Sequence, residues 1–154
     1  MKWQRQRKAF SMITAIFLIV IMATIGAFVM NLGGKIVKVT TAQYQHEQAL
    51  LYAKSYTEYS LLAVTGNDRN SNCLRTITGS IGSDPSNGIG YDITATISYI
   101  GTTAGLGSCP GLGTLVTRTD TPLTVIIDVF VKYKDPDNTT GPWLTVYRRS
   151  VLKI

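Results

Sequence analysis

The sequence is poor in the residues from which metal centres and nucleophilic active sites are built. Its 154 residues include one His and two Cys, and no Cys-x-x-Cys pair is present, so the usual thiolate spacing of a zinc site is missing. His46 has no neighbouring motif that would make it part of a Ser-His-Asp arrangement. The glycine-rich stretch 101–113 lacks both Gly-Lys-Ser/Thr and a Rossmann context. We therefore expect no enzyme activity, no cofactor and no metal site.

Charge is missing from one long segment. No charged residue lies between Ala9 and Gly34, and the first acidic residue of the chain is Glu47. Residues 10–32 would form a helix about 34 Å long, which is enough to cross a hydrocarbon core of about 30 Å. A secretory signal peptide has a shorter apolar region of about 7–15 residues. The sequence therefore predicts a retained transmembrane helix and excludes a wholly soluble or disordered chain.

The basic residues are concentrated before this apolar segment. The chain has 15 Lys and Arg against 9 Asp and Glu, and Lys2, Arg5, Arg7 and Lys8 account for four of the bases, so the remainder carries 11 against 9, or +2. Basic flanks stay on the cytoplasmic side of a membrane, which predicts a cytoplasmic N-terminus and a translocated C-terminal region. A nucleic-acid-binding protein would instead cluster its bases on the folded part. We expect no nucleic-acid partner.

The junction between the basic leader and the apolar segment has a specific pattern. A small residue, then Phe, then a Ser-Met-Ile stretch lead into the aliphatic run, as Lys8, Ala9, Phe10, Ser11, Met12 and Ile13. This pattern resembles the class III leader of type IV pilins and of type II secretion pseudopilins. The resemblance implies cleavage by a prepilin peptidase between Ala9 and Phe10, methylation of the new amino group of Phe10, and an assembly helix that begins with residues 10–14. It also implies other pilins or pseudopilins and an inner-membrane assembly platform as partners.

Two positions depart from the family pattern. Ala9 stands where the family usually has Gly, and Thr14 stands at the fifth mature position, where the family usually has Glu. In pilins that Glu is thought to pair with the amino terminus of a neighbouring subunit. A Thr hydroxyl cannot form this ion pair and instead bonds to its own helix backbone. Since some minor pseudopilins share this loss, we expect a minor pilin-like subunit of a type IV pilus or type II secretion system.

Two alternatives stay open at this stage. Thr14 is also compatible with an ordinary membrane helix, and the chain with a single-pass, membrane-anchored periplasmic binding or receptor module. In either case the expected location is the bacterial inner membrane, with the C-terminal head in the periplasm. Processing of the leader discriminates between a pilin-like subunit, in which a prepilin peptidase removes the leader, and a membrane-anchored module, which keeps its N-terminus.

The expected fold class is α+β, with a long N-terminal helix packed on a small antiparallel sheet, as in pilins. Residues 1–9 form the leader, 10–33 the transmembrane and assembly helix, 34–66 an amphipathic helix, and 67–154 the β head. Gly33 and Gly34 should loosen the helix, which should end at Gly66-Asn67-Asp68. Large residues recur at helical spacing and predict the face that packs on the head; they are Val37, Tyr44, Leu51, Tyr52, Tyr59 and Leu62.

Residues 67–87 are rich in Gly, Ser, Asn and Asp and are interpreted as irregular, with one short strand near 74–78. Alternation predicts strands at 91–100, 124–133 and 143–152, the last two joined by a hairpin loop at 134–142. The expected inward-facing residues are Ile93, Ala95, Ile97, Tyr99, Val125, Ile127, Val129, Val131, Leu144, Val146 and Leu152, while Asp128 faces solvent.

Cys73 and Cys109 lie 36 positions apart, in loops on the translocated side. That compartment permits disulfides, so a disulfide is favoured over two free thiols. Asp135, Asp137 and Asn138 offer oxygen ligands at short spacing, but the EF-hand pattern is absent. A hairpin turn is therefore favoured there over a calcium site.

Overall fold

A computed structural model of the chain describes the backbone of residues 4–112 and 123–154, and the side chains from residue 12 onward within those ranges. The elements in this part are helix α1 (Gln4–Gly66), strand β1 (Thr76–Asp84), the 3-10 turn η1 (Pro85–Asn87), strand β2 (Ile89–Ile100), helix α2 (Thr103–Leu106), strand β3 (Thr124–Tyr133) and strand β4 (Leu144–Lys153). The α+β class is confirmed. The chain divides into two compact units between Gln43 and Tyr44, and α1 contributes to both.

Helix α1 is 63 residues long. It contains no Pro, and it continues through Gly33 and Gly34 without a break. Its end at Gly66 is where the sequence predicted it. Beyond it, the main-chain oxygen of Asp68 accepts hydrogen bonds from the N–H groups of Ser71 and Asn72 at 3.2 and 3.0 Å. These bonds turn the chain toward the sheet.

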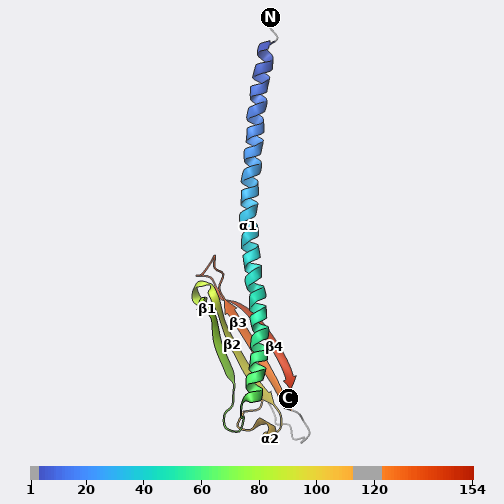
Figure 1. The fold of residues 1–154 in the computed structure, drawn as a ribbon, viewed down its shortest axis with the longest axis vertical. Helices are drawn as coiled ribbons and strands as arrows, with labels where there is room; N and C mark the ends of the chain where they lie inside the picture. The colour runs from blue at the N-terminus through green and yellow to red at the C-terminus, as the bar shows by residue number, and fades with distance from the viewer. Residues whose placement is uncertain (1–3, 113–122) are drawn as a thin grey trace. The chain divides into compact units, whose positions relative to one another are not determined.

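The described residues form one four-stranded antiparallel sheet in the order β1-β2-β3-β4 (Figure 1). Each strand pairs with the next along the chain. Short connections join β1 to β2 and β3 to β4, while a longer segment that contains α2 joins β2 to β3. The strands predicted at 91–100, 124–133 and 143–152 are confirmed within about two residues, and so is the hairpin loop that follows β3.

Strand β1 corrects the prediction for residues 67–87. It is nine residues long, not a short strand inside an irregular segment. Ile77 and Ile81 alternate with polar residues and pack against the core, and the pairing register shifts between Ile81 and Asp84. The glycines that suggested irregular structure have local functions. Tyr56 packs directly over Gly79, and Gly82 has φ +98° at the register shift, where a Cβ would lie 2.5 Å from the Ile89 oxygen.

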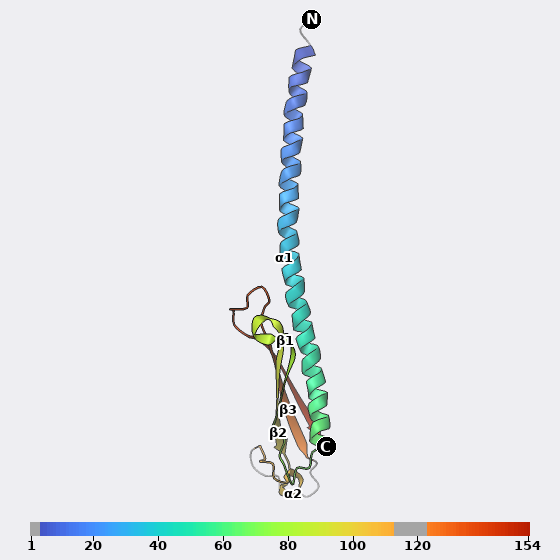
Figure 2. The same ribbon diagram turned by 60° about the vertical axis from the view of Figure 1, so that its left-hand side comes forward.

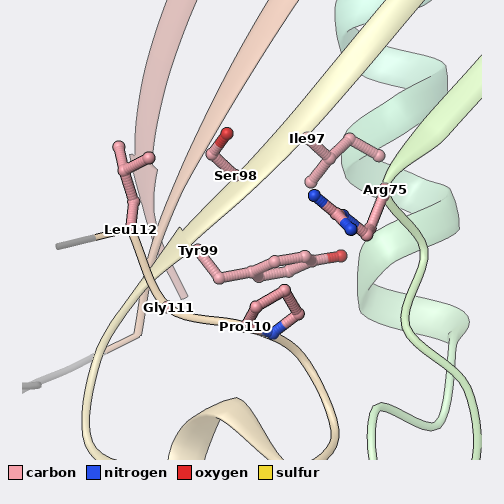
Figure 3. A pocket seen from close by; sticks show the side chains of 7 residues that line it. All are labelled: Arg75, Ile97, Ser98, Tyr99, Pro110, Gly111 and Leu112. Atoms are coloured by element: carbon pink, nitrogen blue, oxygen red, sulfur yellow. The ribbon is translucent and has the colours of Figure 1, made fainter.

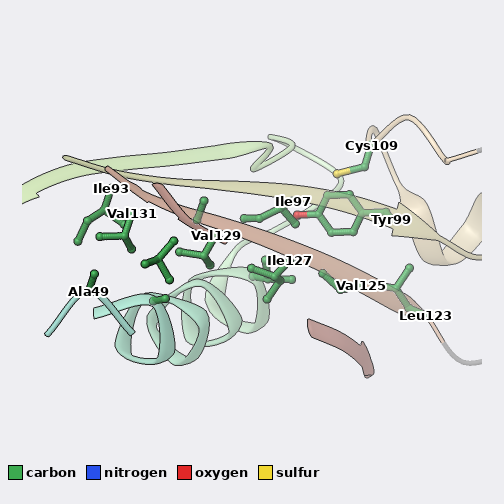
Figure 4. Packing of buried hydrophobic residues seen from close by; sticks show 14 of the residues in the cluster. Ala49, Ile93, Ile97, Tyr99, Cys109, Leu123, Val125, Ile127, Val129 and Val131 are labelled. Atoms are coloured by element: carbon green, nitrogen blue, oxygen red, sulfur yellow. The ribbon is translucent and has the colours of Figure 1, made fainter. Parts of the chain in front are cut away.

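In the second unit, residues 44–66 of α1 lie along one face of the sheet, as both ribbon views show (Figures 1 and 2). The central strands fill the core (Figure 4). All eight residues predicted to face inward on β2 and β3 are buried, as expected. On β4 only Val146 is buried, while Leu144 is 43% exposed and Leu152 is partly buried. The prediction for Leu144 is wrong because β4 is an edge strand.

The predicted packing face of the helix is also wrong. The side chains of α1 buried in the core belong to small residues, namely Ala49, Ala53, Thr57, Ser60 and Val64. Ser60 keeps no hydrogen-bond partner for its hydroxyl, so its small size is what suits it to this position. The sheet already supplies bulky side chains, and a helix lies close to such a surface only where its own side chains are short. Of the predicted residues, only Tyr52 packs against the core.

A disulfide joins Cys73 to Cys109, as predicted. It connects the segment after α1 to the segment after β2. Residues 101–112 form local structure: the Thr102 side chain caps the short helix α2, and Leu106 is buried. Ser108 adds two hydrogen bonds to the Arg69 oxygen, from its N–H at 2.9 Å and from its hydroxyl at 2.7 Å. Gly113 lies outside the described residues.

Candidate functional site

The apolar part of α1 exposes its side chains around the whole helix. Its most hydrophobic window is 0% buried within the structure, and it lies in the only described helix that is long and apolar enough to cross a membrane. The exposed large residues in this part are Met12, Ile13, Ile16, Phe17, Leu18, Ile19, Val20, Ile21, Met22, Ile25, Phe28, Val29, Met30 and Leu32. A helix that is apolar on every side requires a lipid or protein environment. This region is therefore compatible with a single-pass anchor.

The predicted processing and assembly residues all fall in α1. Ala9, Phe10 and Ser11 are helical in their backbone, and their side chains lie outside the described part. Met12 and Ile13 are 73% and 69% exposed, and Thr14 is exposed too. Since the helix begins at Gln4, the bond between Ala9 and Phe10 lies within it, near its start. A peptidase acting at this bond needs the helix end to open locally.

The hydroxyl of Thr24, within the apolar segment, is satisfied by the helix itself. The Thr24 hydroxyl donates to the Ile21 oxygen at 2.8 Å. In lipid a hydroxyl without a partner is costly, and this bond to the preceding turn removes that cost. The segment can thus stay in a bilayer without an external hydrogen-bonding partner for Thr24.

A second apolar surface lies on the α1 residues of the head unit, on the side away from the sheet. We call it the outward stripe, and it consists of Tyr44, Leu51, Tyr59 and Leu62. Each of these side chains is more than half exposed. Positions 44 and 51 are seven residues apart, about two helical turns, so they lie on one side of the helix. The outward stripe contains most of the residues that the sequence had assigned to the core.

Tyrosines cluster where α1 meets the sheet. The ring centroid of Tyr91 lies 5.0 Å from that of Tyr52 and 5.6 Å from that of Tyr133. The Tyr91 hydroxyl donates to the Gln45 oxygen at 3.3 Å, and the Tyr133 hydroxyl lies 3.5 Å from His46 Nδ1. Burial raises the pKa of both Tyr91 and Tyr133 above the ordinary value of a tyrosine. The cluster therefore serves packing, and it accounts for the position of His46.

A small pocket opens beside the disulfide-linked loop (Figure 3). Its volume is about 110 Å³, and its lining includes Arg75, Ser98, Tyr99 and Pro110. Ligand sites for small molecules usually measure about 300–1,000 Å³, so this pocket holds only a few waters. The Tyr99 hydroxyl donates to the Leu74 oxygen at 2.7 Å and so is satisfied within the protein.

The loop after β3 forms turns of its own. The Asp137 N–H donates to Asp135 Oδ1 at 2.9 Å, and the Asn138 N–H donates to the Asp135 oxygen at 3.0 Å. These are the bonds of a turn that starts at Asp, which was the favoured interpretation of this loop. In the part of the chain that the structure describes, no three His, Cys, Asp or Glu residues come together as a metal site would require.

The chain was compared with known proteins in three ways. No protein-family model matches it, and neither a search of curated proteins nor one of solved structures finds a match. What the sequence and structure define is a class of architecture: an α+β head whose first helix continues into an exposed apolar segment.

Proposed function

We propose that this protein is a minor pilin-like subunit of a type IV pilus or type II secretion system. The observation that carries the proposal is the exposed apolar part of α1, which follows a leader similar to those of prepilins. Two further features support it. The helix runs unbroken from the leader into the head, and the outward stripe leaves large apolar residues uncovered on the head itself.

The proposed mechanism is mechanical and noncovalent. Before assembly, the apolar segment lies in the inner membrane with the head in the periplasm. A prepilin peptidase removes residues 1–9, and the assembly platform moves the subunit into a fibre. There the apolar side chains exchange contact with lipid for contact with neighbouring helices, so their burial is kept and the transfer carries no large hydrophobic cost.

Thr14 determines which kind of subunit this is. A subunit that repeats along a fibre benefits from an ion pair that registers each newcomer, whereas a neutral Thr cannot supply one. A subunit present in one or a few copies can be placed by contacts of its head. The outward stripe, on the side of α1 away from the sheet, is the surface we assign to this placement.

N-terminal mass spectrometry of membrane and sheared-fibre fractions tests the proposal. We expect the mature chain to begin at Phe10 with a methylated amino group, and Ala9→Leu to block processing while Ala27→Leu leaves it intact. A chain that begins at Met1 in every fraction would contradict the proposal and favour the membrane-anchored binding module. A chain that begins downstream of Asn31 would contradict both.

A second experiment tests the outward stripe. The double substitution Leu51→Glu with Leu62→Glu should leave processing unchanged and remove the protein from the fibre fraction, because it places charge on an apolar contact surface. Lys54→Glu, off the stripe on the same helix, is the matched control. If the double variant enters fibres as the wild type does, the stripe has no part in assembly.

A further inference from the structure

We infer that the head carries a binding site for an uncharged polysaccharide on the sheet face opposite α1. One end of this face holds a hollow of about 420 Å³ lined by Thr78, Ser80, Asp92, Thr94 and Lys132. This volume is within the range of small-ligand sites, and the hollow is open to solvent, since Thr78, Ser80, Asp92 and Lys132 are all exposed. We call it the outer hollow. The inference concerns the head alone and does not depend on leader processing.

Strand register brings the polar groups of the outer hollow together. Ser80 of β1 pairs with Asp92 of β2, and Asp92 pairs with Lys132 of β3. In the next row, Thr78 pairs with Thr94. Cross-strand partners lie about 5 Å apart, and alternation puts all five side chains on the face away from the buried residues.

The two charged groups of the outer hollow are available to a ligand. Although Asp92 and Lys132 are cross-strand partners, no salt bridge joins them among the described residues, whereas Arg149 Nε lies 2.7 Å from Asp128 Oδ1 on the same face. A carboxylate accepts hydrogen bonds only and an ammonium donates only, while hydroxyls do both. The outer hollow therefore presents hydrogen-bond acceptors, hydrogen-bond donors and hydroxyls that can do both within one small area.

Aromatic side chains border these polar groups. Phe130 pairs with Thr94, and Tyr147 pairs with Phe130, with the two ring centroids 5.0 Å apart. Tyr147 is about half exposed. Beyond the strand end, Lys134 Nζ lies 5.3 Å from the ring centroid of Trp143. Aromatic faces beside convergent polar groups suit a ligand with both C–H faces and hydroxyls, which is the chemistry of a sugar ring.

Charge balance selects an uncharged ligand. Asp92 and Lys132 contribute opposite charges, and so do Asp128 and Arg149 in the next but one row. Lys153, the cross-strand partner of Thr124 on this face, and Lys134 beside Trp143 add two further cations to the surroundings. The charged residues that line the outer hollow itself are Asp92 and Lys132, so the lining has zero net charge and favours neither a polyanion such as a nucleic acid nor a polycation. A chain of neutral sugars satisfies the hydroxyls, the carboxylate and the ammonium together without any net charge of its own.

The test uses the full chain in micelles of a detergent without a sugar headgroup. Isothermal titration calorimetry measures binding of linear neutral hexasaccharides of glucose, N-acetylglucosamine, galactose and mannose, with a heparin hexasaccharide as the anionic probe. We expect saturable binding of at least one neutral probe and none of heparin. Asp92→Asn and Lys132→Met should each weaken binding about tenfold, the loss typical of a charged hydrogen bond.

Ser98→Ala is the matched control, since Ser98 lies on the same face outside the outer hollow. It should leave affinity within about twofold. Urea midpoints of all three variants establish that the fold is retained. The inference is overturned if no neutral probe binds at millimolar concentration, if only heparin binds, or if Ser98→Ala weakens binding as much as Asp92→Asn does.

Discussion

Removing the disulfide should destabilise the head mainly through the unfolded chain. Replacement of Cys73 and Cys109 together by Ala deletes the covalent link but leaves the hydrogen bonds that hold the same segments together. Those bonds run from Ser108 to the Arg69 oxygen and from the Tyr99 hydroxyl to the adjoining segment. We therefore expect the folded head to keep its structure.

The magnitude follows from the sequence separation. The bond connects residues 36 positions apart. In the chain-entropy model, closing a loop of this size raises the free energy of the unfolded state by about 3.8 kcal/mol at 25 °C, and the disulfide stabilises the folded head by that amount. Total stabilities of small domains are about 5–15 kcal/mol, so the double variant should lose a large part of its free energy of unfolding.

Urea titration of the full chain in detergent, followed by near-ultraviolet circular dichroism, measures this loss. The signal reports on the packed cluster of Tyr52, Tyr91 and Tyr133 in the head. Reduced wild-type protein should unfold at the same urea concentration as the double variant. Ser108→Ala should lower the free energy of unfolding by only about 1 kcal/mol. A loss below about 1 kcal/mol in the double variant would refute the argument from loop entropy.

The remaining predictions concern packing, backbone and charge. Ala53→Leu should lower the free energy of unfolding by about 1–3 kcal/mol, because Ala53 is fully buried against the sheet. Leu51→Gln, on the exposed side of the helix, should change the free energy of unfolding by less than about 0.5 kcal/mol. Urea midpoints measure both changes. Gly82→Ala should destabilise the head by more than about 1 kcal/mol, since φ is +98° there. Hydrogen bonds from Arg149 lower the pKa of Asp128 below its ordinary value of 3.8. The stability that the ionised Asp128 adds is therefore present at neutral pH and is lost as the pH falls below 3.8. Asp128→Asn should flatten the curve of stability against pH in that acid range.

The sequence predicted β3 to the residue because a branched aliphatic stands at every second position from Val125 to Val131, and Tyr133 continues the same inward side. It failed for β1, where glycine and serine make up four of the nine residues. Gly79 and Gly82 serve close approach and a bend in a strand that still pairs. Composition therefore suggested irregular structure, and only the partner strand identifies the pairing.

The helix shows a different limit. Seven-residue recurrence groups Tyr44 with Leu51, but it does not tell which side of the helix meets the sheet. That side is decided by how closely the helix must lie, which favours Ala49 and Ala53. The outer hollow was equally out of reach, because its residues come from three strands and meet only through the register of the sheet.

The misplaced helix face itself bears on function. A soluble α+β head would bury the large residues of its helix and expose small or polar ones, since contiguous exposed apolar patches lower solubility. Here Leu51 and Leu62 are exposed, while Ser60 is buried with an unpaired hydroxyl. The close approach of the helix to the sheet explains why small residues are buried. It does not explain why large apolar residues occupy the exposed side, whereas a surface that covers the outward stripe would explain it. Neighbouring helices in a fibre would cover it, and a lone membrane-anchored module would leave it in water, so the pattern favours assembly over anchoring.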